Sequence, residues 1–292
     1  MEKKQLTTEI SGIRIDSFLQ QHVDISRVVA KKWIKNQCVF VNNTLVTKAS
    51  YNLTKGDLIH YLIEKQPSQP PQDHHTLTID YLYEDNDILI INKPPGIVVH
   101  LGVDTTETTL VNELRKDKVA LYNYGDKNRS GIVHRLDRMT EGLMVLAKTK
   151  LAYESLTQQF KNRQIKKHYY ALLKGNLTQN TIVNQPIDRH PKHRHKYYVS
   201  QNGREACTKF FIKKNFNSTT LCSIELITGR THQIRVHSHF LGYPVIGDAV
   251  YTKTSRKSGQ LLQAYSLGLT HPKNNTHLLF TLPLSERIQT SI

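Results

Sequence analysis

Apolar residues recur at helical spacing in two stretches near the start of the chain. Ile15, Phe18 and Leu19 fall on one side of a helix, and Ile13 extends the pattern. The stretch from 28 to 34 repeats this spacing after Ser26, a residue type that caps helix N-termini. Two short extended runs follow, at 38–41 and 58–61, with turn residues between them. The pattern predicts a small unit of two helices and a few strands.

After residue 77 the pattern changes to longer apolar runs. Strands are predicted at 87–92, 132–133, 143–147, 169–173 and 221–227, and helices at 151–160 and 231–241. In the last helix, Ile234, His237, Phe240 and Leu241 are expected on one side. Because the strand runs do not alternate strictly with helices, the region is predicted to be α+β with a mixed sheet.

A proline-rich polar stretch separates these two regions. Residues 66–72 read Gln-Pro-Ser-Gln-Pro-Pro-Gln, a composition that favours an extended, semi-rigid connection. The sequence therefore predicts a small domain at 12–65, a linker at 66–76 and a large domain at 77–288.

Positive charge is concentrated in one part of the chain. The formal net charge is +16, and between residues 161 and 214 thirteen Lys and Arg face two acids. A solvated surface usually alternates in sign, so this run favours a phosphate-facing surface over a plain basic one. Arg189 and Arg194 are the candidates for phosphate contact there, and nucleic acid is the expected partner.

Other classes of protein fit the sequence less well. No run approaches the roughly 18 apolar residues that span a bilayer, and the first residues resemble no signal peptide. Three scattered cysteines suggest neither a disulfide framework nor a thiolate metal site. His190, His193 and His195 could bind metal, but the cations around them favour an RNA-facing loop. A cytoplasmic, monomeric protein without membrane contact is expected.

The segment 131–143 is the strongest candidate for chemistry. Its charged loop, His-Arg-Leu-Asp-Arg, rises between two predicted strands, and such a rigid base holds a reactive side chain well. Asp137 lies between Arg135 and Arg138. By residue type alone, a structural ion pair is the simpler interpretation.

This segment closely resembles the catalytic signature of the RluA-type pseudouridine synthases, in which His-Arg-Leu-Asp-Arg is followed by Thr and then Gly-Leu. The resemblance places Asp137 on the essential aspartate of that family. It places Arg135 on the arginine that takes the place of the extruded base, and His134 beside it among the substrate-binding candidates. Met139 and Glu141 depart from the usual Asp and Ser of the family.

Three more stretches resemble motifs of the same family, in the same order along the chain. Residues 167–172 match Lys-x-Tyr-x-Ala and place Tyr169, not Tyr170, on the active-site tyrosine. Residues 228–237 match a third motif, in which Arg235 falls on the basic partner of the aspartate and Arg230 is a candidate for substrate binding. Residues 92–100 match the opening motif, which is mostly structural. The resemblance implies a largely antiparallel mixed sheet.

The small N-terminal region is similar to the S4-like α/β RNA-binding fold. The matching stretches are 14–19, 26–27, 39–42 and 55–59, although Asn36-Gln37 stand where that family usually has glycine. In the family the two helices carry basic residues to RNA; here these would be Arg27, Lys31, Lys32 and Lys35. An ordinary helical cap on the larger domain is the alternative.

Together the resemblances imply an isomerase that converts uridine to pseudouridine in RNA, with Asp137, Tyr169 and Arg235 as its catalytic residues. The reaction has no redox step and need not activate water, so neither cofactor nor metal is expected. Family members with an S4-like module mostly resemble modifiers of large-subunit ribosomal RNA, which makes 23S RNA the expected substrate. Transfer RNA is the alternative substrate. A binding protein for ribosome assembly without catalysis, or an N-glycosylase, are the alternative functions.

Overall fold

A computed structural model of the protein describes residues 2–23, 25, 27–63, 78–100, 108–125, 127–252 and 259–292. Contacts between Cα atoms divide the chain into two compact units, residues 1–73 with 123–130 and residues 74–122 with 131–292. Each unit has its own apolar cluster. The predicted linker at 66–76 and the predicted cap Ser26 lie outside the described residues. Within the described ranges, no helix is long and apolar enough to cross a membrane.

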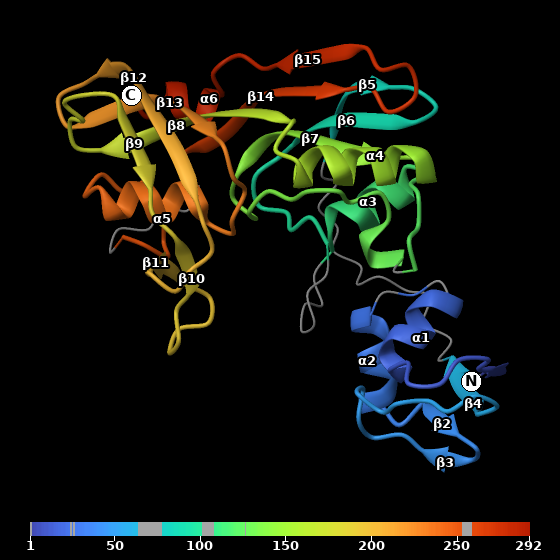
Figure 1. Ribbon diagram of the computed structural model, residues 1–292. Helices are drawn as coiled ribbons and strands as arrows, with labels where there is room; N and C mark the ends of the chain where they lie inside the picture. The colour runs from blue at the N-terminus through green and yellow to red at the C-terminus, as the bar shows by residue number, and fades with distance from the viewer. Residues whose placement is uncertain are drawn as a thin grey trace. The chain divides into compact units, whose positions relative to one another are not determined.

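The first unit packs two helices on a four-stranded antiparallel sheet of order β1-β4-β2-β3 (Figure 1). Ile15, Leu19, Ile34, Val39 and Ile59 lie in its buried cluster. Both predicted helices and both predicted strands are confirmed. The element bounds are β1 (Glu2–Thr7), α1 (Ile15–His22), α2 (Arg27–Lys35), β2 (Val39–Val41), β3 (Thr44–Leu45), β4 (Leu58–Ile63) and a short 3-10 turn (Lys127–Arg129).

The turn before β2 explains why this chain can do without the usual glycine. Gln37 has a φ of +59°, in the left-handed region where glycine is favoured. Its backbone N–H still donates to the carbonyl of Ile34 at 3.1 Å, which closes the end of α2. The turn geometry is therefore kept, at a modest conformational cost, by a non-glycine residue.

A buried carboxylate joins the two helices of this unit. Asp16 is fully buried and accepts hydrogen bonds from Arg14 and from Arg27, whose Nε atoms each lie 3.0 Å from a carboxylate oxygen. Burial alone would raise the pKa of Asp16, but the two guanidinium groups lower it to about 2. Arg27 is thus held in place beside α1 while its side chain remains 45% exposed.

We predict that Asp16→Asn destabilises this unit by about 1–2 kcal/mol at pH 7, since one pKa unit corresponds to about 1.4 kcal/mol and both arginines are half-exposed. The folded pKa is below the unfolded value, so the stabilisation is present above about pH 4 and is lost as pH falls towards 2. Trp33, the single tryptophan, stacks on Tyr61 at 5.5 Å and reports this unit alone in urea titrations. A wild-type advantage that stays constant from pH 7 to pH 2 would contradict the assignment.

The second unit is built on a nine-stranded mixed sheet. Its order is β5-β6-β7-β14-β8-β13-β12-β9, with β15 also paired to β14 (Figure 1). Among the described pairings of this sheet only β7 with β14 is parallel. The strand bounds are β5 (Asp80–Glu84), β6 (Ile88–Lys93), β7 (Glu141–Ala147), β8 (Lys166–Lys174), β9 (Thr181–Asn184), β12 (Cys207–Asn215), β13 (Thr219–Leu226), β14 (Leu262–Thr270) and β15 (His277–Thr281). The predicted α+β class with a largely antiparallel sheet is confirmed.

Helices cover both faces of the strands β6 and β7, which explains their nearly continuous apolar sequence. Leu89 and Ile91 share a cluster with Leu110 and Leu114 of α3 (Leu110–Lys116), while Ile88 and Ile90 share one with α4 (Lys150–Lys161). Two more helices, α5 (Gln233–Phe240) and α6 (Glu286–Gln289), lie further along the chain. A separate hairpin pairs β10 (Ile187–Arg189) with β11 (Tyr197–Val199), and α5 packs against β11 and β12.

Three local predictions for this unit were wrong. Ile132 and Val133 do not form a strand; Ile132 makes a single bridge to Leu146. The helix expected at 231–241 begins at Gln233, because His232 adopts a left-handed φ of +58°. Phe240, expected on the apolar side of that helix, is 52% exposed. The bridge at Ile132 and the turn at His232 override the local apolar pattern in the first two cases, and Phe240 is the last residue of α5, where the helix ends.

Candidate active site

The loop that carries Asp137 lies between the bridge at Ile132 and the start of β7, and hydrogen bonds hold it on both sides. The carbonyl of Asp137 accepts from the N–H of Thr140 at 3.1 Å, and the Thr140 hydroxyl accepts from Gln260 at 3.2 Å. On the other side, Gly96 and Arg138 exchange two hydrogen bonds of 2.9 Å. The loop is therefore fixed by segments far apart in the sequence.

A fully buried lysine, Lys93, adds a further hold on this loop. Its ammonium group donates to the carbonyls of Pro94 at 2.7 Å, Ile97 at 3.0 Å and Arg138 at 3.1 Å. Burial lowers the pKa of Lys93 to about 7, partly offset by the charges of Asp137 and Glu141. The opening motif thus contributes a strand and a buried amine that donates hydrogen bonds to the loop.

The glycine after the loop is required by close packing. Gly142 has a φ of +117°, and a Cβ atom there would collide with the carbonyl oxygen of Ala264. This is where β7 and β14 run parallel, at Gln263–Glu141 and Ala264–Gly142. Only glycine lets the two strands approach this closely next to Asp137.

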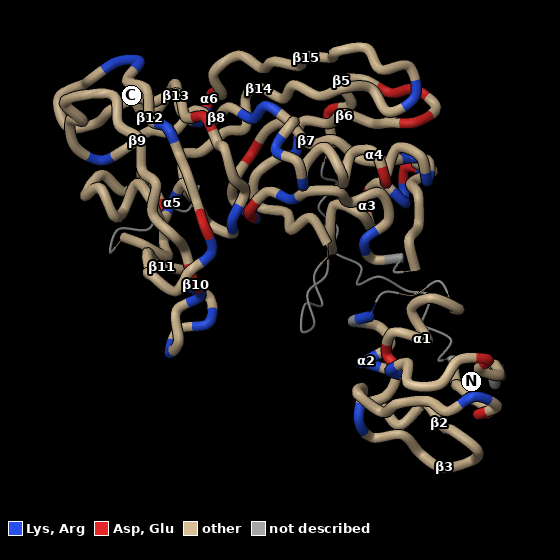
Figure 2. Tube along the Cα trace, viewed as in Figure 1, with Lys and Arg blue, Asp and Glu red and all other residues tan. Residues whose placement is uncertain are grey.

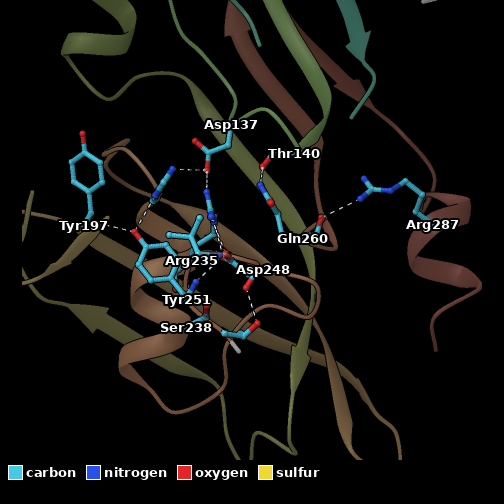
Figure 3. Close-up of polar contacts among 12 residues, drawn as sticks. Asp137, Thr140, Tyr197, Arg235, Ser238, Asp248, Tyr251, Gln260 and Arg287 are labelled. Carbon is cyan, nitrogen blue, oxygen red and sulfur yellow. Dashed lines mark hydrogen bonds and ion pairs between the residues drawn. The ribbon is translucent and has the colours of Figure 1, made fainter. Parts of the chain in front are cut away.

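Arg235 bridges two carboxylates at the start of α5 (Figure 3). Its Nη1 donates to Oδ2 of Asp137 at 2.8 Å, while Nε and Nη2 donate to Asp248 at 2.6 and 2.8 Å. Burial alone would lower the pKa of Arg235, but the hydrogen bonds to Asp248 and the charge of Asp137 raise it above its ordinary value. A permanent cation thus faces one oxygen of Asp137.

Asp248 is the second carboxylate that pairs with Arg235. It is fully buried, and its Oδ1 also accepts from the N–H groups of Val250 at 2.9 Å and Tyr251 at 3.3 Å. The Tyr251 ring lies 5.2 Å from the Arg235 guanidinium carbon. Asp248 therefore orients Arg235 from the side opposite to Asp137.

Tyr169 faces the same pocket from β8. It is 8% exposed, and burial followed by the charge of Asp137 raises its pKa well above the ordinary value. The phenol therefore stays protonated at neutral pH. The next residue, Tyr170, points to the other face of the strand and stacks on Tyr265 with ring centroids 3.8 Å apart.

Asp137, Tyr169 and Arg235 line one cavity of about 490 Å³. Its walls come from the loop 133–140, the end of α4, β8 and the segment 226–235. Among the residues that the structure describes, six Lys and Arg line it and Asp137 is the one acid. The pocket is thus cationic around a single carboxylate, which suits an anionic substrate.

The three predicted substrate-binding residues all belong to this lining. Arg135 is exposed. Arg230 is partly buried and donates from Nε to the carbonyl of Glu205 at 2.9 Å. His134 accepts from the N–H of Val145 at 3.0 Å and stacks on Phe160 at 4.6 Å, and burial lowers its pKa to about 3. Contact of these three residues with a substrate stays a prediction. His134 also has a structural part, because its ring nitrogen accepts the hydrogen bond from Val145.

The turn before α5 carries two side chains that the sequence did not single out for chemistry. Gln233 accepts from Thr228 and from the N–H of Arg230, at 2.7 and 2.9 Å. His232 lies with Nε2 3.8 Å from Oδ2 of Asp137, too far for a hydrogen bond. Because burial lowers the pKa of His232, the ring is neutral at pH 7 and this contact is not an ion pair.

The predicted RNA-binding residues are found on two surfaces, each within one unit. Lys31 and Lys35 of α2 line a shallow depression with Arg14 and Lys48, while Lys32 is exposed. Figure 2 shows the other concentration of Lys and Arg, at the loop of the β10–β11 hairpin. There Arg189 donates to the carbonyl of Arg194 at 2.6 Å, and both side chains are exposed.

One group of metal-ligand residues occurs in the described part of the chain, away from this cavity. Asp85, Asp87 and His271 have ligand atoms within 4.8 Å of one another. These atoms already serve structural bonds: Asp85 accepts from His271 at 2.8 Å, and Asp87 accepts from Thr149 at 2.8 Å. The group ties the β5–β6 turn to α4 and the end of β14.

Sequence reasoning missed Lys93, Asp248 and Gln233 as parts of the site. A usable signal existed for Lys93, a lysine at the end of a strongly apolar strand. Gln233 lies inside the motif at 228–237 and Asp248 lies after it, but their partners, Thr228 and Arg235, are identifiable only from the fold.

The chain is similar to known proteins over most of its length. The sequence profile described as RNA pseudouridylate synthase matches residues 87–240, and the profile of the S4 domain matches residues 13–59. The ribosomal large subunit pseudouridine synthase D of Nitrosomonas europaea is 37% identical over 95% of this chain and 83% of its own length. The protein of the same name from Escherichia coli K12 is 36% identical over 98% and 92%.

A Bacillus subtilis protein described as an uncharacterized RNA pseudouridine synthase is 37% identical, covering 94% of this chain and 91% of its own. Among solved structures, the human RNA pseudouridylate synthase domain containing 4 has a TM-score of 0.57 and 26% identity, over 73% of this chain and 91% of its own. The human RNA pseudouridylate synthase domain containing 1 has a TM-score of 0.59 and 24% identity, over 70% of this chain and 83% of its own, and supports the fold.

Proposed function

Because the chain belongs to the RNA pseudouridylate synthase family, we propose that it converts uridines of large-subunit ribosomal RNA to pseudouridine, with Asp137 as the catalytic carboxylate. The observation that carries this proposal is the single carboxylate of the cationic pocket, held on one oxygen by Arg235. The substrate follows from the names of the similar proteins and from the S4 domain.

The reaction breaks the bond between N1 and C1′, turns the base and joins C5 to C1′. The proton on C5 leaves and N1 gains one, so the product is an isomer of the substrate. Arg235 fixes Oδ2 of Asp137 through a hydrogen bond of 2.8 Å, and no described residue donates a hydrogen bond to Oδ1. Figure 3 shows that second oxygen directed away from Arg235. It is the atom available to attack the nucleotide or to accept a proton from its sugar.

The uridine must leave its stack to reach Asp137. Tyr169 supplies a buried ring beside the carboxylate, on which uracil can stack. Its hydroxyl, which is protonated at neutral pH, can relay the C5 proton by accepting it on oxygen while its own proton passes to solvent. Arg135, exposed at the same pocket, is suited to fill the vacated place in the RNA by stacking. The hairpin arginines and the lysines of α2 would bind phosphates outside the pocket.

The direct test is pseudouridine mapping of all RNA in cells with and without the gene. We expect signals to disappear at positions of large-subunit ribosomal RNA and to return with the wild-type gene but not with Asp137→Asn. If pseudouridine disappears only from transfer RNA, the substrate is transfer RNA and not ribosomal RNA. If deletion of the gene removes no pseudouridine but impairs ribosome assembly, and Asp137→Asn restores assembly fully, the protein acts by binding and not by catalysis. Free uracil released from RNA in vitro would indicate an N-glycosylase.

A prediction for Tyr169 separates its ring from its hydroxyl. Tyr169→Phe keeps the ring in the apolar cluster, so KM should change little, while kcat should fall by about 10²-fold or more because the variant cannot relay the C5 proton. Because its pKa is raised, Tyr169 should add no alkaline limb to the wild-type pH profile below pH 10. Tritium release from RNA labelled at C5 of uridine measures both quantities.

Tyr170→Phe is the matched control, since Tyr170 lies on the other face of the same strand. It should retain activity within about twofold, because the substitution removes only a hydroxyl on the face of β8 away from the pocket. Equal losses in the two variants would show that the effect of Tyr169→Phe comes from the strand and not from the pocket.

A further inference from the structure

The side chain of Lys167 faces the catalytic pocket and makes no hydrogen bond or ion pair with the residues that the structure describes. Lys167 lies two residues before Tyr169 on β8, and alternate residues of a strand share a face. Both residues line the cavity with Asp137. Lys167 therefore presents its ammonium group to the same space in which the nucleotide must be held.

This ammonium lacks an anionic partner. Among the residues that the structure describes, no carboxylate pairs with Lys167, and its Nζ lies 5.9 Å from the centroid of the Phe160 ring. The other buried cation of the pocket differs, because Arg235 has two carboxylates. Even Arg163 at the rim pairs with Glu205 at 2.8 Å. A half-buried cation without a counterion is costly unless a ligand supplies the negative charge.

The surroundings of Lys167 favour an incoming anion. Burial, and then the positive charge of Arg230, lower the pKa of Lys167 to about 8. Lys167 and Arg230 therefore lie close enough to repel each other in the pocket wall, and an anion between them would relieve this repulsion. Gly229 lies beside the ammonium, and a Cβ atom built there would be 3.4 Å from Nζ. The backbone at this point carries no side chain that would separate Lys167 from the cavity.

We propose that Lys167 and Arg230 form a phosphate subsite in the pocket wall, which binds the RNA phosphodiester next to the target uridine. This inference rests on the proposed function and extends it to how the nucleotide is held. The phosphate supplies the charge that Lys167 lacks, through a charge-assisted hydrogen bond. Because Asp137 repels phosphate, the subsite also keeps the backbone to one side of the carboxylate and directs the sugar and base towards it.

The subsite can be tested by the salt dependence of binding to a fluorescein-labelled decamer of uridylate. Each phosphate contact on a single strand contributes about 0.7 to the slope of log K against log salt. Lys167→Met should lower this slope by about 0.7 and weaken binding by about tenfold at low salt. Lys167→Arg should keep both values near wild type. Lys273→Met removes the same charge from an exposed turn and should change neither.

Turnover gives an independent measurement, with a transcript of large-subunit ribosomal RNA labelled with tritium at C5. Lys167→Met should raise KM about tenfold and change kcat by less than about threefold. A slope equal to that of wild type, or a loss confined to kcat, would overturn the subsite. If wild type binds the decamer through Lys167 but does not turn over the transcript, the ribosomal substrate is wrong and the subsite stands. Thermal melting of each variant checks that the fold is kept.

Discussion

Asp137→Asn is expected to lower kcat by at least about 10³-fold, the largest effect of any single substitution in this protein. Asparagine has nearly the shape of aspartate, and its amide oxygen can still accept from Arg235, so the pocket should keep its form. What disappears is the negative charge needed for a nucleophile or a base, and loss of such a group typically costs 10²- to 10⁴-fold or more. Tritium release under single-turnover conditions measures the chemical step directly.

Stability and RNA binding should change little in this variant. Arg235 retains both hydrogen bonds to Asp248, so its charge is not left unpaired. Asp80→Asn is the matched control, because Asp80 is exposed on β5 and its carboxylate bonds only to Asn92 among the described residues. Activity of Asp137→Asn above a tenth of wild type would rule out a direct part for this carboxylate in the reaction.

The second large effect is expected at Asp248, which lies outside the proposed chemistry. Asp248→Ala leaves the buried guanidinium of Arg235 without the two hydrogen bonds of 2.6 and 2.8 Å. Removing one partner of a buried ion pair typically costs about 3–5 kcal/mol of folding free energy. Because Arg235 would then no longer be fixed opposite Asp137, kcat should also fall by about tenfold or more.

Urea denaturation followed by circular dichroism measures the stability loss, since the single tryptophan lies in the other unit. Glu154→Ala removes an exposed acid that lies 3.8 Å from Lys150, and should cost less than about 0.5 kcal/mol. Should Asp248→Ala fail to fold, Asp248→Asn keeps the shape of the side chain and tests the same fall in kcat. A buried-pair role is contradicted if Asp248→Ala costs no more than the surface control.

The sequence identifies most of the elements that depend on local apolar pattern. The helices α1, α2 and α4 and the strands β6, β7, β8 and β13 were predicted within a few residues of their bounds. β1 was not predicted, because its polar residues form a strand only through pairing with β4. Similarly, β14 pairs with β7, β8 and β15, and no local property of 262–270 indicates these long-range partners.

For the candidate site, the motif residues themselves were sufficient to select Asp137, Tyr169 and Arg235 as members of one pocket. They lie 32 and 66 residues apart in sequence, so only their order in known motifs connected them. The sequence could not show which oxygen of Asp137 meets Arg235, or that His134 is engaged with the N–H of Val145. Such details depend on side-chain geometry, which motif spacing does not encode.

By itself, the sequence determined the reacting residue types, the excess of cations and the apolar periodicity, because these are properties of the chain before it folds. Only the tertiary structure decided which charges are compensated. It gives Arg235 two carboxylates, binds Lys93 to three carbonyls and leaves Lys167 facing the pocket with no described acid beside it. The physical reason is that the energy of a charge depends on its burial and on partners brought from distant segments, and both arise only when the sheet and its loops are assembled.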